Sequence, residues 1–340
     1  MARTGNEARN STRLDTVARE AGVSVATVSK VLNGRADVAQ TTRDRVEALL
    51  AHQGYEPRTV RKGSKLIELV FHELDSAWAI EVIRGVERVA RKMGLSLILT
   101  ESGDRHSPGS QWIAGVLERR PLGVVLVFSD LTIDEKSMLR TRNIPFVIVD
   151  PAGDPAPDVP AIGSANWAGG LTATRHLISL GHTRIGMISG PDDILCSQAR
   201  VAGYRAALQG ADIAFDASLV REGDFHVEGG AARARELLDM PGAPTAIFAG
   251  SDLQAMGVYE AARERGLTIP HDLSVVGYDD LQSSAWLGPP LTTIRQPLAE
   301  MAEQATLLVV RLASGERVET VRLDLATSLV ERLSSAPPRS

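Results

Sequence analysis

Near the N-terminus, two short sets of apolar residues recur at helical spacing on either side of a glycine. The two sets consist of Val17, Ala18 and Ala21, and of Val25, Val28, Val31 and Leu32. Gly22 lets the chain turn sharply, and the Ser24 hydroxyl can accept a hydrogen bond from an amide at the start of the second helix. Residues 14–34 are therefore predicted to form two helices joined by a tight turn. A DNA-reading helix-turn-helix and a helical hairpin within a larger core both fit this pattern.

A third helix is predicted over residues 41–53 and completes a small all-α head. Its inward-facing positions are Val46, Leu49 and Leu50. Residues 1–12 are polar and are predicted to be a disordered extension, so that the head covers residues 13–57. Residues 58–65, RTVRKGSK, form a basic connector with one glycine. This connector is the best candidate for a domain boundary.

From residue 66 onward, apolar runs of strand length alternate with longer helical stretches. The predicted strands are LIELVF, LSLILT, GVVLVF, PFVIVD, RIGMIS, TAIFAG and LSVVGYDD. The predicted helices cover residues 80–93, 112–119, 133–142, 167–180, 197–208, 228–238 and 253–265. Such alternation predicts an α/β fold with parallel sheets covered by helices on both faces. This alternation is too long for one comfortable open sheet, and residues 151–160 form a proline-rich break, so we expect two lobes.

Two parallel sheets in two lobes predict where a ligand binds. Ligands of such sheets lie beyond the carboxyl ends of the strands, because the loops there converge. The strand ends that contain acidic residues or glycine are at Asp150, Pro191, Asp252 and Asp279. A cleft between the lobes is therefore expected to collect residues from these four places.

Charge is divided unevenly along the chain. Residues 1–65 hold twelve Lys and Arg against seven Asp and Glu, whereas the rest of the chain holds 25 against 35. A basic module on an acidic body indicates that only the N-terminal part approaches a polyanion. No apolar segment approaches 18 residues and no signal-peptide pattern opens the chain, so a soluble, cytoplasmic protein without a membrane partner is expected.

Catalytic patterns are missing from the sequence. It contains no GxSxG, GxxxxGK[ST] or HExxH, no GxGxxG after a strand, and no metal-ligand spacing among its seven histidines. The single cysteine, Cys196, excludes an intrachain disulfide and a multi-cysteine zinc site, and we interpret it as a small buried residue. An enzyme and a secreted sugar-binding module are the alternatives to a DNA-binding protein. The enzyme interpretation lacks catalytic sequence motifs, and the secreted sugar-binding module does not explain the basic head.

Several segments together resemble the LacI family of bacterial transcriptional regulators, from residue 13 to about residue 333. These segments are VAREAGVSVATVSKVLNG, LTATRHLISLGHTRIGMISG, RVAGYRAAL, LSVVGYDD and PPLTTIRQP. The resemblance implies a body similar to periplasmic sugar-binding proteins, with two lobes joined by three crossing strands. It also implies a homodimer or tetramer, a near-palindromic double-stranded operator and a small sugar effector, with no cofactor and no metal.

The resemblance places the three lobe crossings near Gly163, Pro290 and Arg322. The N-terminal lobe is then expected to comprise residues 66–163 and 291–322. The C-terminal lobe is expected to comprise residues 164–290 and 323–335.

The second helix of the head carries the candidate base-reading residues, because the start of a recognition helix reaches base edges in the major groove. These residues are Val25, Ala26, Thr27 and Lys30. Val25 and Ala26 offer only apolar contacts, and Lys30 stands where many family members have arginine, so it supplies a point charge rather than a planar fork. The resemblance implies further DNA contacts by Arg13, Thr16, Asn33 and Thr42. These contacts would fix the register of the head on the DNA without specifying sequence.

The connector departs from the family pattern, in which paired leucines wedge into the minor groove and kink the duplex. RTVRKGSKLI has no leucine before Leu66. We therefore predict that Arg58, Arg61 and Lys62 follow a narrow minor groove as a basic arm, with less bending than is usual in the family. A solvated linker without groove contact is the alternative.

By resemblance, the effector site draws on both lobes. Its candidate residues are Trp78, Asp150, Arg200, Phe225, Asp252 and Asp279. An arginine and a carboxylate suit paired hydroxyls, and an aromatic ring suits the apolar face of a sugar. Because Ala79 replaces a second family aromatic, a sugar is favoured over a purine. The predicted function is a repressor of a sugar-utilisation operon, with a sugar-responsive activator and a purine-responsive repressor as alternatives.

Replacing Arg61 and Lys62 with alanine tests the basic arm. Each phosphate that the arm no longer neutralises reduces the slope of log affinity against log salt concentration by about 0.9. The double variant should therefore show a shallower slope than the unsubstituted chain in a DNA-binding titration over several salt concentrations. An unchanged slope would leave the solvated linker as the correct interpretation.

Overall fold

The computed structural model describes residues 15–32, 38–52, 64–74, 77–103, 108–127, 130–316, 318 and 322–339. The predicted extension and five predicted DNA contacts lie outside these residues. Those five contacts are Arg13, Asn33, Arg58, Arg61 and Lys62.

The head contains the predicted helix-turn-helix. A helix over residues 15–21 is followed by α2 (Val25–Leu32) and α3 (Gln40–His52). Gly22 has a φ of +66°, which a residue with a side chain rarely adopts. The Ser24 hydroxyl accepts a hydrogen bond of 3.1 Å from the Thr27 amide, which confirms the predicted cap. The buried apolar residues of the head are Val17, Ala18, Ala21, Val28, Val31, Val46 and Leu50, with Leu49 packed against them.

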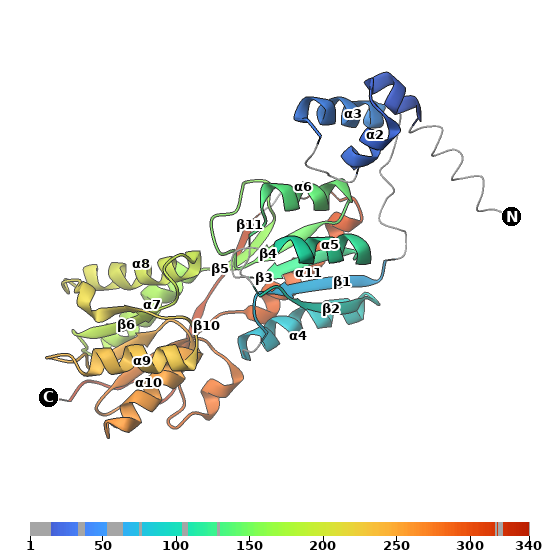
Figure 1. The fold of residues 1–340 in the computed structure, drawn as a ribbon. Helices are drawn as coiled ribbons and strands as arrows, with labels where there is room; N and C mark the ends of the chain where they lie inside the picture. Colours follow the sequence, from blue (N-terminus) through green and yellow to red (C-terminus); the bar gives the residue numbers. More distant parts are fainter. Residues whose placement is uncertain are drawn as a thin grey trace.

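The body consists of two lobes, each built on a six-stranded sheet (Figure 1). The N-terminal lobe has the strand order β11 (Arg322–Leu325), β5 (Ala161–Ser164), β4 (Phe146–Val149), β3 (Gly123–Val127), β1 (Leu66–Phe71) and β2 (Ser96–Glu101). The C-terminal lobe has the order β12 (Ser328–Val330), β10 (Thr292–Arg295), β9 (Ser274–Asp279), β8 (Ala246–Ala249), β6 (Ile185–Ser189) and β7 (Val220–Glu222). All neighbouring strands are parallel except β10 and β12. The predicted α/β class with two sheets is confirmed.

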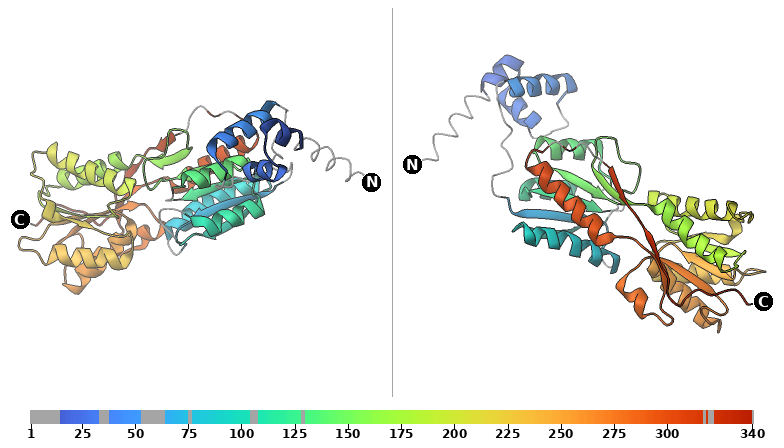
Figure 2. Two further views of the ribbon diagram at one scale, coloured as in Figure 1. Left: turned by 45° about the horizontal axis from the view of Figure 1, so that its top comes forward. Right: turned by 180° about the vertical axis from the view of Figure 1, so that it is seen from behind.

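Helices cover both faces of each sheet, as expected for buried parallel strands. In the N-terminal lobe these are α4 (Ala77–Lys92), α5 (Gly109–Arg119), α6 (Ile133–Thr141) and α11 (Leu298–Ala313). In the C-terminal lobe these are α7 (Asn166–Ser179), α8 (Leu195–Gln209), α9 (Val227–Leu238) and α10 (Asp252–Glu264), with the 3-10 helices η1 (Ala217–Leu219) and η2 (Gln282–Trp286). Figure 2 shows the same layers from two further directions.

Two of the three predicted lobe crossings are displaced along the chain. The chain leaves the N-terminal lobe between β5 and α7, close to the expected Gly163. It returns after β10, at Gln296 and Pro297, and not at Pro290, because β10 pairs with β9 of the C-terminal lobe. It leaves again after β11 and not at Arg322, because β11 pairs with β5. Residues 292–295 and 323–325 therefore belong to the opposite sheets from those predicted.

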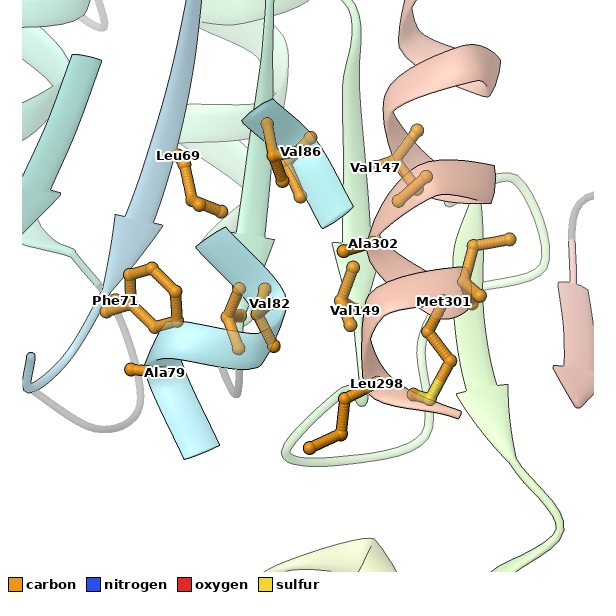
Figure 3. Close-up of a cluster of buried hydrophobic side chains, with 14 of the residues drawn as sticks. Leu69, Phe71, Ala79, Val82, Val86, Val147, Val149, Leu298, Met301 and Ala302 are labelled. Carbon is orange, nitrogen blue, oxygen red and sulfur yellow. The ribbon is translucent and has the colours of Figure 1, made fainter. Parts of the chain in front are cut away.

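Helix α11 was not recognised in the sequence, although it forms part of the N-terminal core. It lies beside α4 on one face of the sheet, and both helices contribute to a cluster of buried side chains (Figure 3). Val82 and Val86 of α4 and Met301 and Ala302 of α11 are completely buried there. A segment that is late in the chain thus completes a lobe that begins before residue 70.

Gly85 allows α4 and α11 to approach closely. A Cβ atom added at this residue would lie 2.2 Å from the carbonyl oxygen of Ala299 and 2.7 Å from the Cβ atom of Ala302. The first neighbour is a backbone atom, so it can move only if the whole helix α11 shifts. The lobe therefore depends on a glycine at this position.

Replacing Gly85 with alanine should lower the free energy of unfolding by about 2 kcal/mol, because overpacking outweighs the roughly 1 kcal/mol that alanine adds to a helix. Chemical denaturation measures this change. Gly153→Ala is the matched control, since a Cβ atom there has no neighbour within 4 Å. Equal stability of the two variants would show that the close approach is not needed.

Candidate functional site

A cavity of about 260 Å³ lies between the two lobes. The N-terminal lobe lines it with Phe71, His72, Glu73 and Trp78. The C-terminal lobe lines it with Pro191, Ile194, Arg200, Asp224, Phe225, His226, Ser251, Leu253 and Asp279. Most of these residues lie at or just beyond the carboxyl ends of β1, β6, β7, β8 and β9, as the strand pattern predicted.

Arg200 is a buried cation on α8 that lines this cavity, with only 3% of its surface exposed. It donates hydrogen bonds to Asn166 Oδ1 (2.9 Å), to the Gly250 carbonyl oxygen (2.6 Å) and to Gln296 Oε1 (3.1 Å). Its guanidinium carbon lies 3.7 Å from the centre of the Tyr278 ring. An arginine has five N–H groups, so two have no acceptor among the described residues.

Asp279 provides an acceptor at the end of β9 and also lines the cavity. Burial raises the pKa of this carboxyl group well above its usual value, and the nearby Arg200 opposes the rise. The backbone φ of Asp279 is +113°, in a region that residues with side chains rarely adopt. Such strain is retained where the surroundings over-determine a geometry, which is typical of binding sites. Asp280, which follows, lies outside the cavity lining and pairs with Arg295 and Arg332.

Phe225 presents its ring to the cavity from the segment before α9. The ring lies over the backbone of Gly190, where an added Cβ atom would be 2.0 Å from Phe225 Cζ. The guanidinium carbon of Arg200 lies 5.6 Å from the centre of the same ring. The glycine at the end of β6 thus makes room for an aromatic surface. Trp78, at the start of α4, supplies a second ring from the N-terminal lobe.

Asp150 does not line the cavity but lies behind Arg200, at the end of β4. Its Oδ1 atom accepts a hydrogen bond of 3.5 Å from Asn166, whereas its buried Oδ2 atom has no hydrogen-bond partner among the residues that the structure describes. Burial raises the pKa of this carboxyl group to about 6, and the nearby Arg200 opposes the rise. Its predicted role as a direct effector contact therefore stays a prediction.

Asp252 also lies outside the cavity lining, and its carboxylate is occupied by the fold. It accepts hydrogen bonds from Ser284 Oγ (2.5 Å), Thr293 Oγ1 (2.6 Å) and the Leu281 amide (2.8 Å). These hydrogen bonds fix η2 and β10 against the start of α10. The structure thus gives Asp252 a supporting position, and its neighbours Ser251 and Leu253 face the cavity instead.

A polar contact joins the two lobes at the cavity and was not predicted. His226 Nε2, from the C-terminal lobe, lies 3.4 Å from Glu73 Oε2 of the N-terminal lobe. His72 Nε2 lies 3.8 Å from the same oxygen. Polar residues in loops resemble solvated surface in a sequence, so only the rule that ligands meet strand ends could have found His72 and Glu73 after β1.

Further contacts hold the lobes together around the cavity. Leu253 and Leu281 of the C-terminal lobe pack against the buried cluster of the N-terminal lobe that contains Trp78. The Leu195 amide, at the start of α8, donates a hydrogen bond of 2.8 Å to the Ala152 carbonyl oxygen. The lobes therefore enclose the cavity with contacts that a change in their relative orientation would break.

Four of the predicted DNA contacts lie on α2. Val25, Ala26 and Lys30 are exposed, and Thr27 is half-buried with its hydroxyl 2.9 Å from Ser24 Oγ. Val28 and Val31 are buried, as expected for core positions. Thr16 and Thr42 are half-buried. Base contacts by these residues stay predictions.

The single cysteine, Cys196, is buried and does not line the cavity. Burial raises the pKa of the Cys196 thiol to about 12, so it stays protonated at neutral pH. Among the described residues, no three His, Cys, Asp or Glu side chains are grouped as metal binding requires. None of the helices in the described ranges is long and apolar enough to cross a membrane.

Comparisons with known proteins agree with both parts of the fold. Residues 13–58 match the lacI family of bacterial regulatory proteins, and residues 174–335 match a periplasmic binding protein-like domain. The HTH-type transcriptional repressor CytR of Escherichia coli (strain K12) is 33% identical over 89% of this chain and 90% of its own length.

Solved structures extend the similarity to almost the whole chain. The complex of the transcriptional regulator CelR with cellobiose has a TM-score of 0.72 and 32% identity, over 94% of this chain and 99% of that one. The lac repressor dimer bound to operator and the anti-inducer ONPF has a TM-score of 0.70 and 29% identity, over 94% and 98%. With a helix-turn-helix head, a two-lobed body and these relatives, the chain belongs to the LacI family of bacterial regulatory proteins.

Proposed function

We propose that this chain is a DNA-binding transcriptional repressor of a sugar-utilisation operon, controlled by a small sugar bound between its lobes. The observation that carries the proposal is the cavity, in which a buried arginine and a buried carboxylate accompany aromatic rings. Its relatives include a repressor and a regulator bound to cellobiose. Residues 25–30 of the head would read the operator.

The chemistry of the cavity fits a polyhydroxylated ligand. Arg200 retains two N–H donors and Asp279 offers acceptor oxygens, so that neighbouring hydroxyl groups can each donate or accept a hydrogen bond. The Phe225 and Trp78 rings provide apolar surfaces for the C–H face of a sugar ring. Because the relatives that match almost the whole chain are transcriptional regulators, we infer that the ligand leaves the site unchanged and that the chain is a regulator and not an enzyme.

The cavity is placed so that its ligand can change the shape of the body. Trp78 and Glu73 come from one lobe, and Arg200 and Phe225 come from the other. A ligand that contacts both lobes favours the closed arrangement, provided that it binds this arrangement more tightly than an open one. Closure would then alter the surface through which two chains associate and so change the spacing of two heads on a near-palindromic operator. A homodimer is the assembly that such an operator requires.

A purine-type ligand is the second candidate, and Phe71 is the observation that favours it. Phe71 lines the cavity, so three aromatic residues are present where the sequence indicated two. Ala79, whose small size argued against a purine, is 1% exposed and packs in the core rather than lining the cavity. Isothermal titration with cellobiose, ribose and hypoxanthine in parallel distinguishes the two ligand classes. The sign of regulation is tested by transcription in vitro, where an activator would raise transcript levels.

Replacing Arg200 with alanine should leave operator binding intact and shift the response to the sugar to much higher sugar concentrations. Loss of hydrogen bonds from a charged donor weakens a ligand by about 1.5–3 kcal/mol, which is roughly 10- to 150-fold in affinity. Fluorescence anisotropy of labelled operator DNA, titrated with sugar, measures both properties. Arg205→Ala is the matched control, since Arg205 lies on the same helix but is exposed.

Phe225→Ala is a second variant for this test, and it is less liable to misfold because the Phe225 ring is only half-buried. Loss of the stacking surface should weaken the sugar by about 0.5–1.5 kcal/mol, or roughly two- to tenfold. A normal response in both Arg200→Ala and Phe225→Ala would show that the effector binds elsewhere.

Replacing Asp150 with asparagine should change how stability depends on pH. Because burial raises the pKa of Asp150 to about 6, the folded chain holds this proton more tightly than the unfolded chain, and its ionisation costs stability as pH rises from about 4 to 6. The variant avoids this cost, which corresponds to about 3 kcal/mol. Its free energy of unfolding should exceed that of the unsubstituted chain above pH 6, with the difference vanishing below pH 4.

Asp158→Asn is a control in which the free energy of unfolding should change in the opposite direction. Hydrogen bonding to Arg140 lowers the pKa of the exposed Asp158, so its ionisation stabilises the folded chain and the variant should be the less stable at neutral pH. Denaturant titrations at pH 4, 5, 6 and 7.5 compare the two. A difference for Asp150→Asn that stays constant with pH would exclude its buried ionisation as the cause.

A further inference from the structure

The edge of the N-terminal lobe farthest from the cavity is where the connector joins the body. Strands β1 to β4 are parallel, so their carboxyl ends all point toward the cavity and their amino ends form the opposite edge. That edge is built from residues 64–66, from the ends of α4 and α5, and from the loop before β4. We call it the linker-side face.

Hydrogen bonds fix the last two residues of the connector, Ser64 and Lys65, to this face. The Ser64 hydroxyl donates a hydrogen bond of 2.9 Å to the carbonyl oxygen of Arg120, at the end of α5. The Leu122 amide donates one of 2.6 Å to the Leu66 carbonyl oxygen, and the Ser96 amide donates one to the Lys65 carbonyl oxygen. Lys65 therefore lies next to the loop that contains Arg120 and to the loop that follows Lys92.

The linker-side face carries more cations than its described carboxylates can pair. Lys65, Lys92 and Arg120 are exposed, and none forms an ion pair with a carboxylate of the described residues. Arg142, in the loop before β4, lies close enough to Arg120 for its pKa to be lowered, chiefly by burial and further by that like charge. The carboxylate of Glu118, on the last turn of α5, is exposed and opposes only part of this charge.

Pairing is the rule for arginines elsewhere on the acidic body. Arg91 and Arg311, near the same edge, pair with Glu87 and Glu316. In the C-terminal lobe, paired arginines include Arg221, Arg235, Arg263, Arg265 and Arg332. An excess of positive charge on one face of a body whose net charge is negative indicates a surface that meets a polyanion.

The connector keeps this face close to whatever the head binds. Eleven residues, 53–63, join α3 to Ser64, and a fully extended chain of that length spans at most about 40 Å. We propose that the linker-side face is a second DNA-binding surface, which contacts backbone phosphates beside the bases that α2 reads. This inference rests on the proposed binding of DNA by the head, and it would extend the contact with a polyanion from the N-terminal part to the first lobe of the body.

Phosphate binding of this kind would add affinity without adding sequence preference, because phosphates are the same at every base pair. Such a contribution suits a head whose exposed Val25 and Ala26 can make only apolar base contacts. The C-terminal lobe, in which most of the described arginines form ion pairs, would remain away from the DNA.

The test is the triple variant Lys65→Gln, Lys92→Gln, Arg120→Gln of the full chain, bound to operator DNA at several salt concentrations. The slope of log affinity against log salt should become shallower by about 0.9 for each phosphate that is no longer neutralised, so by about 2 to 5 in a dimer with six substituted cations. The ratio of operator to random-sequence affinity should stay unchanged. Circular dichroism and effector binding check that the variant folds.

A charge-matched control separates local binding of phosphate from general electrostatics. Arg175→Gln, Arg205→Gln, Arg263→Gln removes three exposed cations from the C-terminal lobe and should leave the slope as it is in the unsubstituted chain. An unchanged slope in the linker-side variant, or equal changes in both variants, would overturn the proposal. Failure of the unsubstituted chain to bind any DNA would refute the proposed function as well.

Discussion

The buried guanidinium of Arg200 is the interaction that joins the ligand cavity to the crossings between the lobes. A charge enclosed by protein is costly unless hydrogen bonds replace the water that it loses. Arg200 meets this requirement with acceptors from α7, from the end of β8 and from the crossing at Gln296, and it also lies against the Tyr278 ring. Gln296 in turn accepts a hydrogen bond of 2.8 Å from Ser164 of the N-terminal lobe, so one network links the cavity with two of the three crossings.

That network explains why a molecule in the cavity can affect distant parts of the body. The crossings at residues 165, 296 and 326 are the covalent links between the lobes, and contacts around them decide how the lobes are oriented. A ligand that engages the remaining N–H groups of Arg200 acts directly on the same network. Two contacts cross between the lobes: Glu73 with His226, and Leu281 with the N-terminal core. Both contacts would change if the relative orientation of the lobes changed.

The sequence predicted those features that have a local signal. Alternation of apolar runs located most of the long strands and helices, and Gly22 and Ser24 located the turn and the cap of the head. Helix α11 was missed in the sequence. The crossings expected at Pro290 and Arg322 were displaced, because β10 and β11 have only four residues each and distant strands decide their pairing. In the site, Trp78, Arg200, Phe225 and Asp279 line the cavity, and their contact with an effector stays a prediction. Asp252 is instead held by Ser284 and Thr293, partners that only the fold brings to it.

The central claim is that occupation of the cavity and occupation of the operator are thermodynamically coupled. Coupling between two sites is reciprocal, so a sugar that weakens operator binding by some factor must itself bind more weakly, by the same factor, when operator is present. Isothermal titration of the sugar into the free protein and into the protein saturated with operator DNA measures this directly. The account predicts a weaker sugar affinity in the DNA complex, by the factor seen in operator binding. Equal sugar affinity in the two titrations would contradict it.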